Sequence, residues 1–176
     1  MRLTKTLAAG AVALSALVTL TGCGSDEPAA DGAQSKLPKA STMADVQKAV
    51  VERGTECNEL RPIREGMTYM EEEAKNPAWG IKERAACSDG GGSSVTLLLI
   101  GDMAKFQQSL AAKGGGSFAV GQNFAVAAEN DSSGQSLTQN GLLVLSCEQG
   151  ERDKVPSGFE IHEGLVKGCF TTNYNA

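Results

Sequence analysis

The sequence contains a single histidine, His162, and lacks the short motifs that place a nucleophile or a phosphate in an active site. A Ser-His-Asp site would have to combine His162 with Ser93, Ser94 or another serine, but no G-x-S-x-G elbow is present. The glycine runs at 90–92 and 114–116 are not followed by Lys-Ser or Lys-Thr, so they predict turns and not phosphate loops. The sequence therefore predicts no catalytic residue, no enzymatic activity and no cofactor.

Aromatic residues are also few, and the acidic residues show no catalytic spacing. Trp79, the only tryptophan, is expected to pack against the domain and not to serve as a sugar-binding platform. The acidic run at 71–73, and the pair Glu160 and Glu163, do not set one carboxylate against another as acid-base catalysis requires. Charged runs of this kind are typical of a solvated surface.

Long apolar runs are absent after residue 23, where the longest, at 95–100, has only the length of a strand. N-terminal to residue 23, the stretch at 7–20 carries no charge and is preceded by the basic residues Arg2 and Lys5. Fourteen residues are fewer than the ~20 that span a bilayer, so the pattern predicts a signal peptide and not a permanent membrane helix. The following Leu20-Thr21-Gly22-Cys23 resembles the lipobox of bacterial lipoproteins.

This resemblance implies that residues 1–22 are cleaved and that Cys23, the new N-terminus, carries acyl chains such as palmitate. Two or three chains hold a protein stably on a bilayer, because each buried CH₂ contributes ~0.8 kcal/mol. We therefore expect a lipid-anchored protein on the extracytoplasmic face of the cell membrane, with the membrane as a partner through Cys23. The alternative is an ordinary secretory signal peptide, in which Cys23 has no special role.

Cleavage changes the charge balance, because residues 1–22 contain two basic residues and no acidic one. The mature chain has 14 basic and 21 acidic residues, a net charge of −7. Without a cluster of Lys and Arg it is a poor ligand for nucleic acid, so we expect no nucleic-acid partner.

Composition divides the mature chain into a tether and one domain. Residues 23–41 are mostly Gly, Ala, Asp, Ser and Pro, with Leu37 as the one larger aliphatic residue, so we expect a lipidated N-terminus followed by a flexible linker. Residues 42–176 suit a single hydrophobic core. We expect this extracytoplasmic domain to begin with a helix capped by Thr42.

Within this domain the hydrophobic pattern alternates between helix and strand periods. Two hairpins are predicted, one joining 81–87 to 95–100 and one joining 118–120 to 124–128, with a helix capped by Asp102 between them. Residues 142–145 are predicted as a buried strand, and 165–170 as a partner of 159–161. Residues 135–140 are compatible with either a helix or a strand. The prediction is an α+β fold with a small, mainly antiparallel sheet and two or three helices packed on it.

Four cysteines remain when Cys23 is assigned to lipid, and they permit three pairings. Sequence order favours Cys57–Cys87 and Cys147–Cys169, two structural disulfides that staple the domain. A zinc site is the alternative, but the sequence has no C-x-x-C, and export favours disulfides. We therefore predict no metal site.

A second resemblance follows from the order of these elements. The chain resembles small actinobacterial extracytoplasmic lipoproteins of unassigned function, through Cys57, Cys87 and Val120-Gly121-Gln122-Asn123-Phe124, where such proteins often carry Trp in place of Phe124. The likeness covers residues 42–128.

Three classes of function are compatible with these features. We expect first a lipid-anchored interaction or structural module of the cell envelope, with an envelope protein as a possible partner. The alternatives are a lipoprotein that binds a small ligand and an extracytoplasmic enzyme. A pocket with convergent polar groups favours the last two, whereas an exposed apolar patch favours the first.

Overall fold

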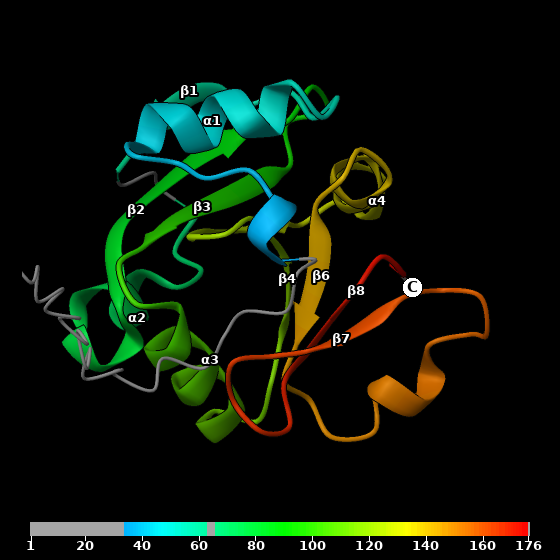
Figure 1. Ribbon diagram of the computed structural model, residues 1–176. Coiled ribbons are helices and arrows are strands. Elements are labelled where there is room, and N and C mark those ends of the chain that lie inside the picture. Colours follow the sequence, from blue (N-terminus) through cyan, green and yellow to red (C-terminus); the bar gives the residue numbers. More distant parts are fainter. Residues whose placement is uncertain (1–33, 63–65, 176) are drawn as a thin grey trace, which may run out of the picture.

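The computed structural model describes residues 34–62 and 66–175 (Figure 1). The predicted signal peptide, Cys23 and most of the predicted linker lie outside the described residues. The helices are η1 (Gln34–Lys36), α1 (Met43–Val51), α2 (Glu71–Lys75), η2 (Pro77–Trp79), α3 (Met103–Ala112), α4 (Asp131–Gln139) and η3 (Arg152–Lys154). The strands are β1 (Asn58–Arg61), β2 (Ile81–Ser88), β3 (Ser94–Ile100), β4 (Ser117–Val120), β5 (Phe124–Ala128), β6 (Leu143–Ser146), β7 (Ile161–Glu163) and β8 (Phe170–Thr172). No helix of this described part is long and apolar enough to cross a membrane.

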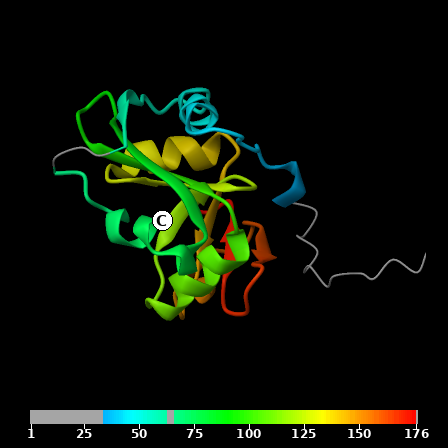
Figure 2. The same cartoon turned by 90° about the vertical axis from the view of Figure 1, so that its left-hand side faces the viewer.

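The strands form one antiparallel sheet in the order β1-β2-β3-β5-β4-β6-β8-β7. Helices α1 and α4 cover one face of the sheet, and α2 and α3 cover the other (Figures 1 and 2). The predicted α+β fold with a mainly antiparallel sheet is therefore confirmed, with four α-helices among the described residues.

Strand β3 is buried on both faces from Val95 onward, as its mostly apolar sequence predicts. Because side chains alternate along a strand, Leu97 and Leu99 pack on the α1 side, whereas Leu98 and Ile100 pack on the α3 side. All four are at most 3% exposed. The predicted hairpin between β2 and β3 is present, and β5 flanks β3 on its other edge.

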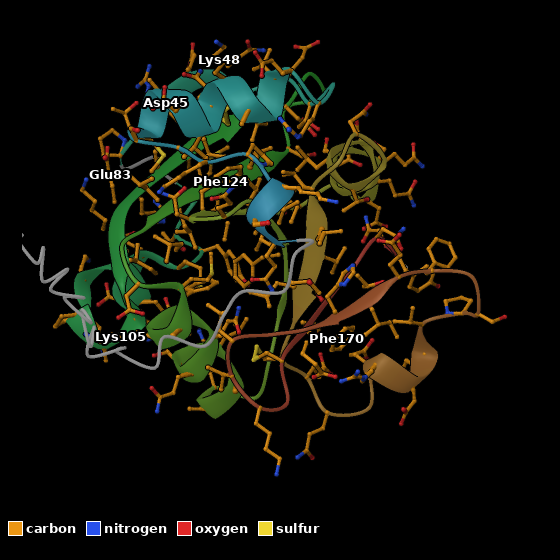
Figure 3. All side chains as sticks on the ribbon, in the orientation of Figure 1. Asp45, Lys48, Glu83, Lys105, Phe124 and Phe170 are labelled. Carbon is orange, nitrogen blue, oxygen red and sulfur yellow. A yellow bond between two sulfur atoms is a disulfide. The ribbon has the colours of Figure 1, made fainter. Side chains whose placement is uncertain are left out.

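Side chains at the predicted positions cap the helices. Thr42 and Asp45 form the capping box of α1, and Asp102 accepts a hydrogen bond from the Lys105 N–H at the start of α3. Figure 3 shows Asp45 and Lys48 on the outer side of α1 and Phe124 in the interior beneath it.

Helix α4 settles the ambiguous segment at 135–140. Asn130 accepts a hydrogen bond from the Ser132 N–H and starts the helix, and Leu137 is fully buried on its inner side. Gly141, with a φ of +96°, follows the helix end in the left-handed conformation that glycine tolerates.

The folded domain begins earlier than predicted, because residues assigned to the linker pack on it. Leu37 is only 8% exposed, in the core between the sheet and α3, and Ala40 is 2% exposed beneath α1. A single leucine in a Gly- and Pro-rich stretch has no periodicity, so the sequence gives no sign of this contact.

The last strand pair is displaced from its predicted position. β7 pairs with β8 at 170–172, whereas residues 164–169 form the connection, closed by a 2.9 Å hydrogen bond from the Gly164 N–H to the Cys169 carbonyl. The pairing predicted for 165–170 is thus shifted toward the C-terminus.

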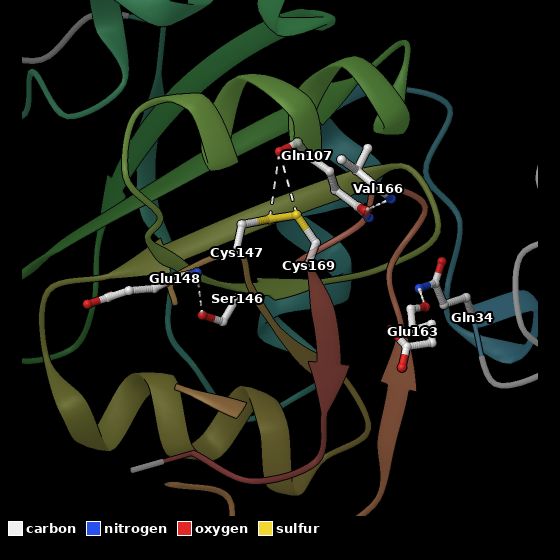
Figure 4. Close-up of a disulfide and its surroundings, with 8 residues drawn as sticks. All are labelled: Gln34, Gln107, Ser146, Cys147, Glu148, Glu163, Val166 and Cys169. Atoms are coloured by element: carbon white, nitrogen blue, oxygen red, sulfur yellow. Dashed lines mark hydrogen bonds between the residues drawn. A yellow bond between two sulfur atoms is a disulfide. The ribbon is translucent and has the colours of Figure 1, made fainter. Parts of the chain in front are cut away.

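The two disulfides have the predicted pairing, Cys57–Cys87 and Cys147–Cys169. The first lies in the core under α1, and the second lies under α3, so each core contains one bridge. In Figure 4 the Gln107 carbonyl of α3 lies over the second bridge, 3.7 and 3.6 Å from its two sulfur atoms. The Gln107 side chain also accepts a hydrogen bond from the Val166 N–H, at 3.2 Å, and ties α3 to the connection between β7 and β8.

Candidate functional site

A pocket of about 500 Å³ lies on the α3 face of the sheet, where β3 begins and β5 ends. Residues 66–69, which precede α2, form its outer wall. Its lining includes Tyr69, Ser94, Thr96, Ser117, Ala127 and Glu129. Residues with hydroxyl groups line the pocket from three segments of the chain, with Tyr69 before α2, Ser94 and Thr96 on β3, and Ser117 on β4.

The local sheet geometry leaves room for this pocket. β4 and β5 pair only at Ala119–Val126 and Val120–Ala125, although β4 already pairs with β6 from Ser117 onward. The two strands therefore part toward Ser117 and Ala128. Small side chains on both strands keep this end of the sheet uncovered, since an alanine or serine fills little of the space above a pleated strand.

Arg84 holds the outer wall of the pocket in place. This β2 side chain is 7% exposed, and its guanidinium donates hydrogen bonds to the carbonyls of Tyr69 (2.8 Å), Pro62 (3.2 Å) and Met67. Burial lowers the pKa of Arg84 below its usual value, and the charge of Glu71 opposes that shift. Because an arginine keeps its proton in proteins, the side chain is a charged strut between strand and loop.

A row of aromatic rings extends inward from the pocket. Tyr69 stacks on Phe118 at 6.0 Å, Phe118 contacts Phe106 edge-on at 5.3 Å, and Phe106 contacts Trp79 at 6.1 Å. Trp79 is thus buried, and the prediction that it packs against the domain is confirmed. Half-burial raises the pKa of Tyr69, so its hydroxyl stays protonated at neutral pH and remains a hydrogen-bond donor.

Glu129 is the one acidic or basic residue of the pocket lining within the described residues. Its Oε2 atom accepts a hydrogen bond from the Ser94 N–H at 3.2 Å, which holds the carboxylate at the rim. Carboxylates repel anions and attract cations. The pocket is therefore suited to a neutral or cationic polar ligand.

A second, smaller pocket of about 200 Å³ lies on the opposite face of the same strand ends, between the sheet and α4. Next to it, Asp89 joins the β2–β3 turn to α4 by accepting hydrogen bonds from the N–H groups of Gly91 and Ser93 and from the Ser133 hydroxyl. Burial raises the pKa of Asp89, but these hydrogen bonds outweigh that effect and the net pKa lies below its ordinary value.

The structure does not bring the sequence candidates for catalysis together. Ser93 and Ser94 lie at the start of β3, whereas His162 lies on β7 at the far edge of the sheet, with its Nε2 atom 3.2 Å from Glu160. The acidic run at 71–73 lies on α2, where Glu72 is exposed and the partly buried Glu73 pairs with Lys113. Among the described residues, no group of three or more His, Cys, Asp or Glu side chains could hold a metal ion.

The pocket and its strut are the features that sequence reasoning missed. The one available signal was Arg84, a charged residue immediately before the apolar Ala85 and Ala86 in a predicted strand. Comparison with known proteins gave no match among family models, curated proteins or solved structures.

Proposed function

We propose that this protein is a lipid-anchored, extracytoplasmic module that binds a small polar solute in the pocket between residues 66–69 and the ends of β3, β4 and β5. The observation that carries the proposal is the pocket itself, with about 500 Å³ and a lining that contains several hydroxyl-bearing residues and one carboxylate. Pockets of this size with a few placed polar groups are typical of small-molecule sites.

The pocket changes the order of preference among the functional classes. An interaction module is expected to expose an apolar patch, but the large apolar side chains that are most exposed, Val51, Tyr69 and Phe159, come from three separate parts of the described fold. The one carboxylate of the lining, Glu129, accepts a hydrogen bond from the Ser94 backbone, and the lining has no histidine or cysteine to pair with it. Binding without chemistry is therefore the function that this geometry supports best.

The anchor part of the proposal rests on the sequence. A basic N-terminus, an uncharged stretch at 7–20 and the Leu20-Thr21-Gly22-Cys23 motif follow one another in the order of a lipoprotein signal. The two disulfides of the folded domain are consistent with export to an oxidising compartment.

Amide chemical shifts test the pocket with a matched set of probes, namely benzyl alcohol, benzylamine and benzoate. We expect the first two to shift the amide signals of Thr96, Ala127 and Ala128, and benzoate to shift them least because Glu129 repels it. Ser94→Trp places an indole on the α3 face of β3, at the partly exposed rim of the pocket, and should abolish these shifts. Ser157→Trp, a control at an exposed site outside the pocket lining, should leave them unchanged. Shifts that are equal in both variants, or that fall outside the pocket, would refute the proposal.

A further inference from the structure

The hydrogen-bond ladder between β4 and β5 ends before the two strands do. It starts at the hairpin bond from the Gly121 N–H to the Phe124 carbonyl (3.1 Å), and its register places Ser117 opposite Ala128. In the described part of the chain, however, the last pair of this ladder is Ala119–Val126, two residues short of that position. The ends of the two strands are therefore neighbours in the sheet order without being paired with each other.

The alternation of backbone groups along the two strands shows where those of the strand ends point. In an antiparallel ladder, the N–H and C=O of one residue point to the same side of the strand, and those of the next residue point to the other side. The Glu129 N–H donates to the Ser94 carbonyl of β3 at 2.9 Å, so the backbone groups of Ala128 point away from β3 and toward β4. Ser117 has the same phase as Gly121, whose N–H points to β5. The backbone groups of Ser117 and Ala128 thus point into the space between the parted strands.

Both pockets of the domain open onto this space. Ser117 and Ala128 line the pocket of about 500 Å³ on the α3 face, and the same two residues line the pocket of about 200 Å³ on the α4 face. We call the space between Ser117 and Ala128 the strand gap. It has backbone donors and acceptors in the plane of the sheet and a pocket on either side of that plane.

We infer that the strand gap binds a short extended peptide, whose backbone pairs with Ser117 and Ala128 and whose successive side chains enter the two pockets. This inference rests on the proposed function and specifies its solute. Each residue of a peptide carries one N–H donor and one C=O acceptor, which are the groups that the two strand ends can pair with. Successive side chains of a strand point to opposite faces of its sheet, so a peptide in the plane of the sheet would direct them alternately into the larger and the smaller pocket.

The pocket linings indicate which side chains the peptide carries. The larger pocket contains the Tyr69 ring and the Glu129 carboxylate, whereas the smaller pocket is lined by Val126 and Leu137 together with Asp131. A carboxylate therefore lines each pocket, and it repels a negative charge. The strand gap is suited to a peptide with neutral or basic side chains, and not to an acidic peptide.

Two isomeric peptides test the backbone pairing on the full chain in detergent micelles. One is trialanine amide, and the other is Ala-Sar-Sar amide, in which sarcosine moves two methyl groups onto the peptide nitrogens and so removes both peptide N–H donors. We expect trialanine amide to shift the amide signals of Ser117 and Ala128, together with Thr96 on one face of the sheet and Leu137 on the other. The isomer should bind at least about tenfold more weakly, because it lacks two donors. Equal binding of the isomers, or shifts confined to one face of the sheet, would overturn the inference.

Amide hydrogen exchange and side-chain preference provide two further readouts. At about ten times the dissociation constant of trialanine amide, exchange at Ser117 and Ala128 should slow about tenfold, because only the free protein exchanges there. Unchanged exchange at both residues would overturn the pairing. Ala-Gln-Ala amide should bind about threefold more tightly than Ala-Glu-Ala amide, whichever pocket receives the central side chain. Tighter binding of the glutamate peptide would contradict the role of the two carboxylates and overturn the choice of neutral or basic peptides.

Two variants at one position separate the backbone from the side chain. Ser117→Pro removes the N–H that points into the strand gap, at the first residue of a strand, where proline is tolerated, and it should weaken trialanine amide about fivefold. Ser117→Ala keeps this N–H and should bind like the native chain. Equal binding to both variants would overturn the pairing, and the isomer pair on the native chain covers the case of a Ser117→Pro variant that folds poorly. If the benzyl probes bind but trialanine amide does not, this inference fails and the proposed function stands, whereas both fail if neither binds.

Discussion

Replacing Arg84 with methionine should loosen the pocket wall and destabilise the domain by about 3 kcal/mol. The change keeps a long apolar stem but removes donors to the Pro62, Met67 and Tyr69 carbonyls. A typical hydrogen bond contributes about 1 kcal/mol net, so the loss of three gives about 3 kcal/mol. Stabilities of single domains are about 5–15 kcal/mol, so this loss is easily measured.

Urea unfolding and amide hydrogen exchange provide the two measurements for this variant. We expect a lower unfolding midpoint, and faster exchange at Tyr69 and Met70 than at the central strand β3. Lys82→Met on the exposed part of the same strand is the control, and it should change stability by less than about 0.5 kcal/mol. Arg84→Lys should recover only part of the loss, because an ammonium group lacks the planar fork that reaches three carbonyls. An unchanged midpoint together with unchanged exchange at Tyr69 would refute the role of Arg84 as a strut.

Three further predictions concern the rest of the domain. Leu37→Ala should lower the free energy of unfolding, measured by chemical denaturation, by about 2–3 kcal/mol, because it opens a cavity under α3. A loss below about 0.5 kcal/mol would show that Leu37 belongs to the linker. Asp89 has a lowered pKa in the folded state, so its stabilising effect is complete above its ordinary pKa and is lost as the pH falls through the lowered value. On acidification from pH 5 to 2, the wild type should therefore lose more stability than Asp89→Asn. Parallel curves of stability against pH for the two proteins would contradict this. The pair Cys147→Ser and Cys169→Ser should lower stability by about 3 kcal/mol in the chain-entropy model, without affecting the Cys57–Cys87 bridge in peptide maps.

Features set by local pattern were predictable from the sequence. The apolar run at 95–100, interrupted only by Thr96, placed β3 in the centre of the sheet, and Thr42, Asp102 and the glycine-rich turns located helix ends and hairpins. These features depend on residues close together along the chain. The disulfides followed from sequence order, and they join segments 30 and 22 positions apart that lie at neighbouring strands.

Features set by contacts between distant segments were not predictable. Leu37 is buried because the Gln122-Asn123 turn, more than eighty residues later, binds the backbone around it. The pocket exists because β4 and β5 part near Ser117 and Arg84 fixes a loop fifteen or more residues before it. Ser, Thr and Ala occur throughout the chain, and nothing in their local pattern shows which of them converge.

Native mass spectrometry of the protein released from its own membrane tests the central claim most directly, because one spectrum reports the anchor and the pocket together. We expect a chain that begins at Cys23, carries acyl groups and retains a small noncovalent adduct. The adduct should be absent from Ser94→Trp and present in Ser157→Trp. A chain that retains residues 1–22 or lacks acyl groups would contradict the anchor. A native chain without an adduct, or an adduct that persists in Ser94→Trp, would contradict the pocket as the binding site.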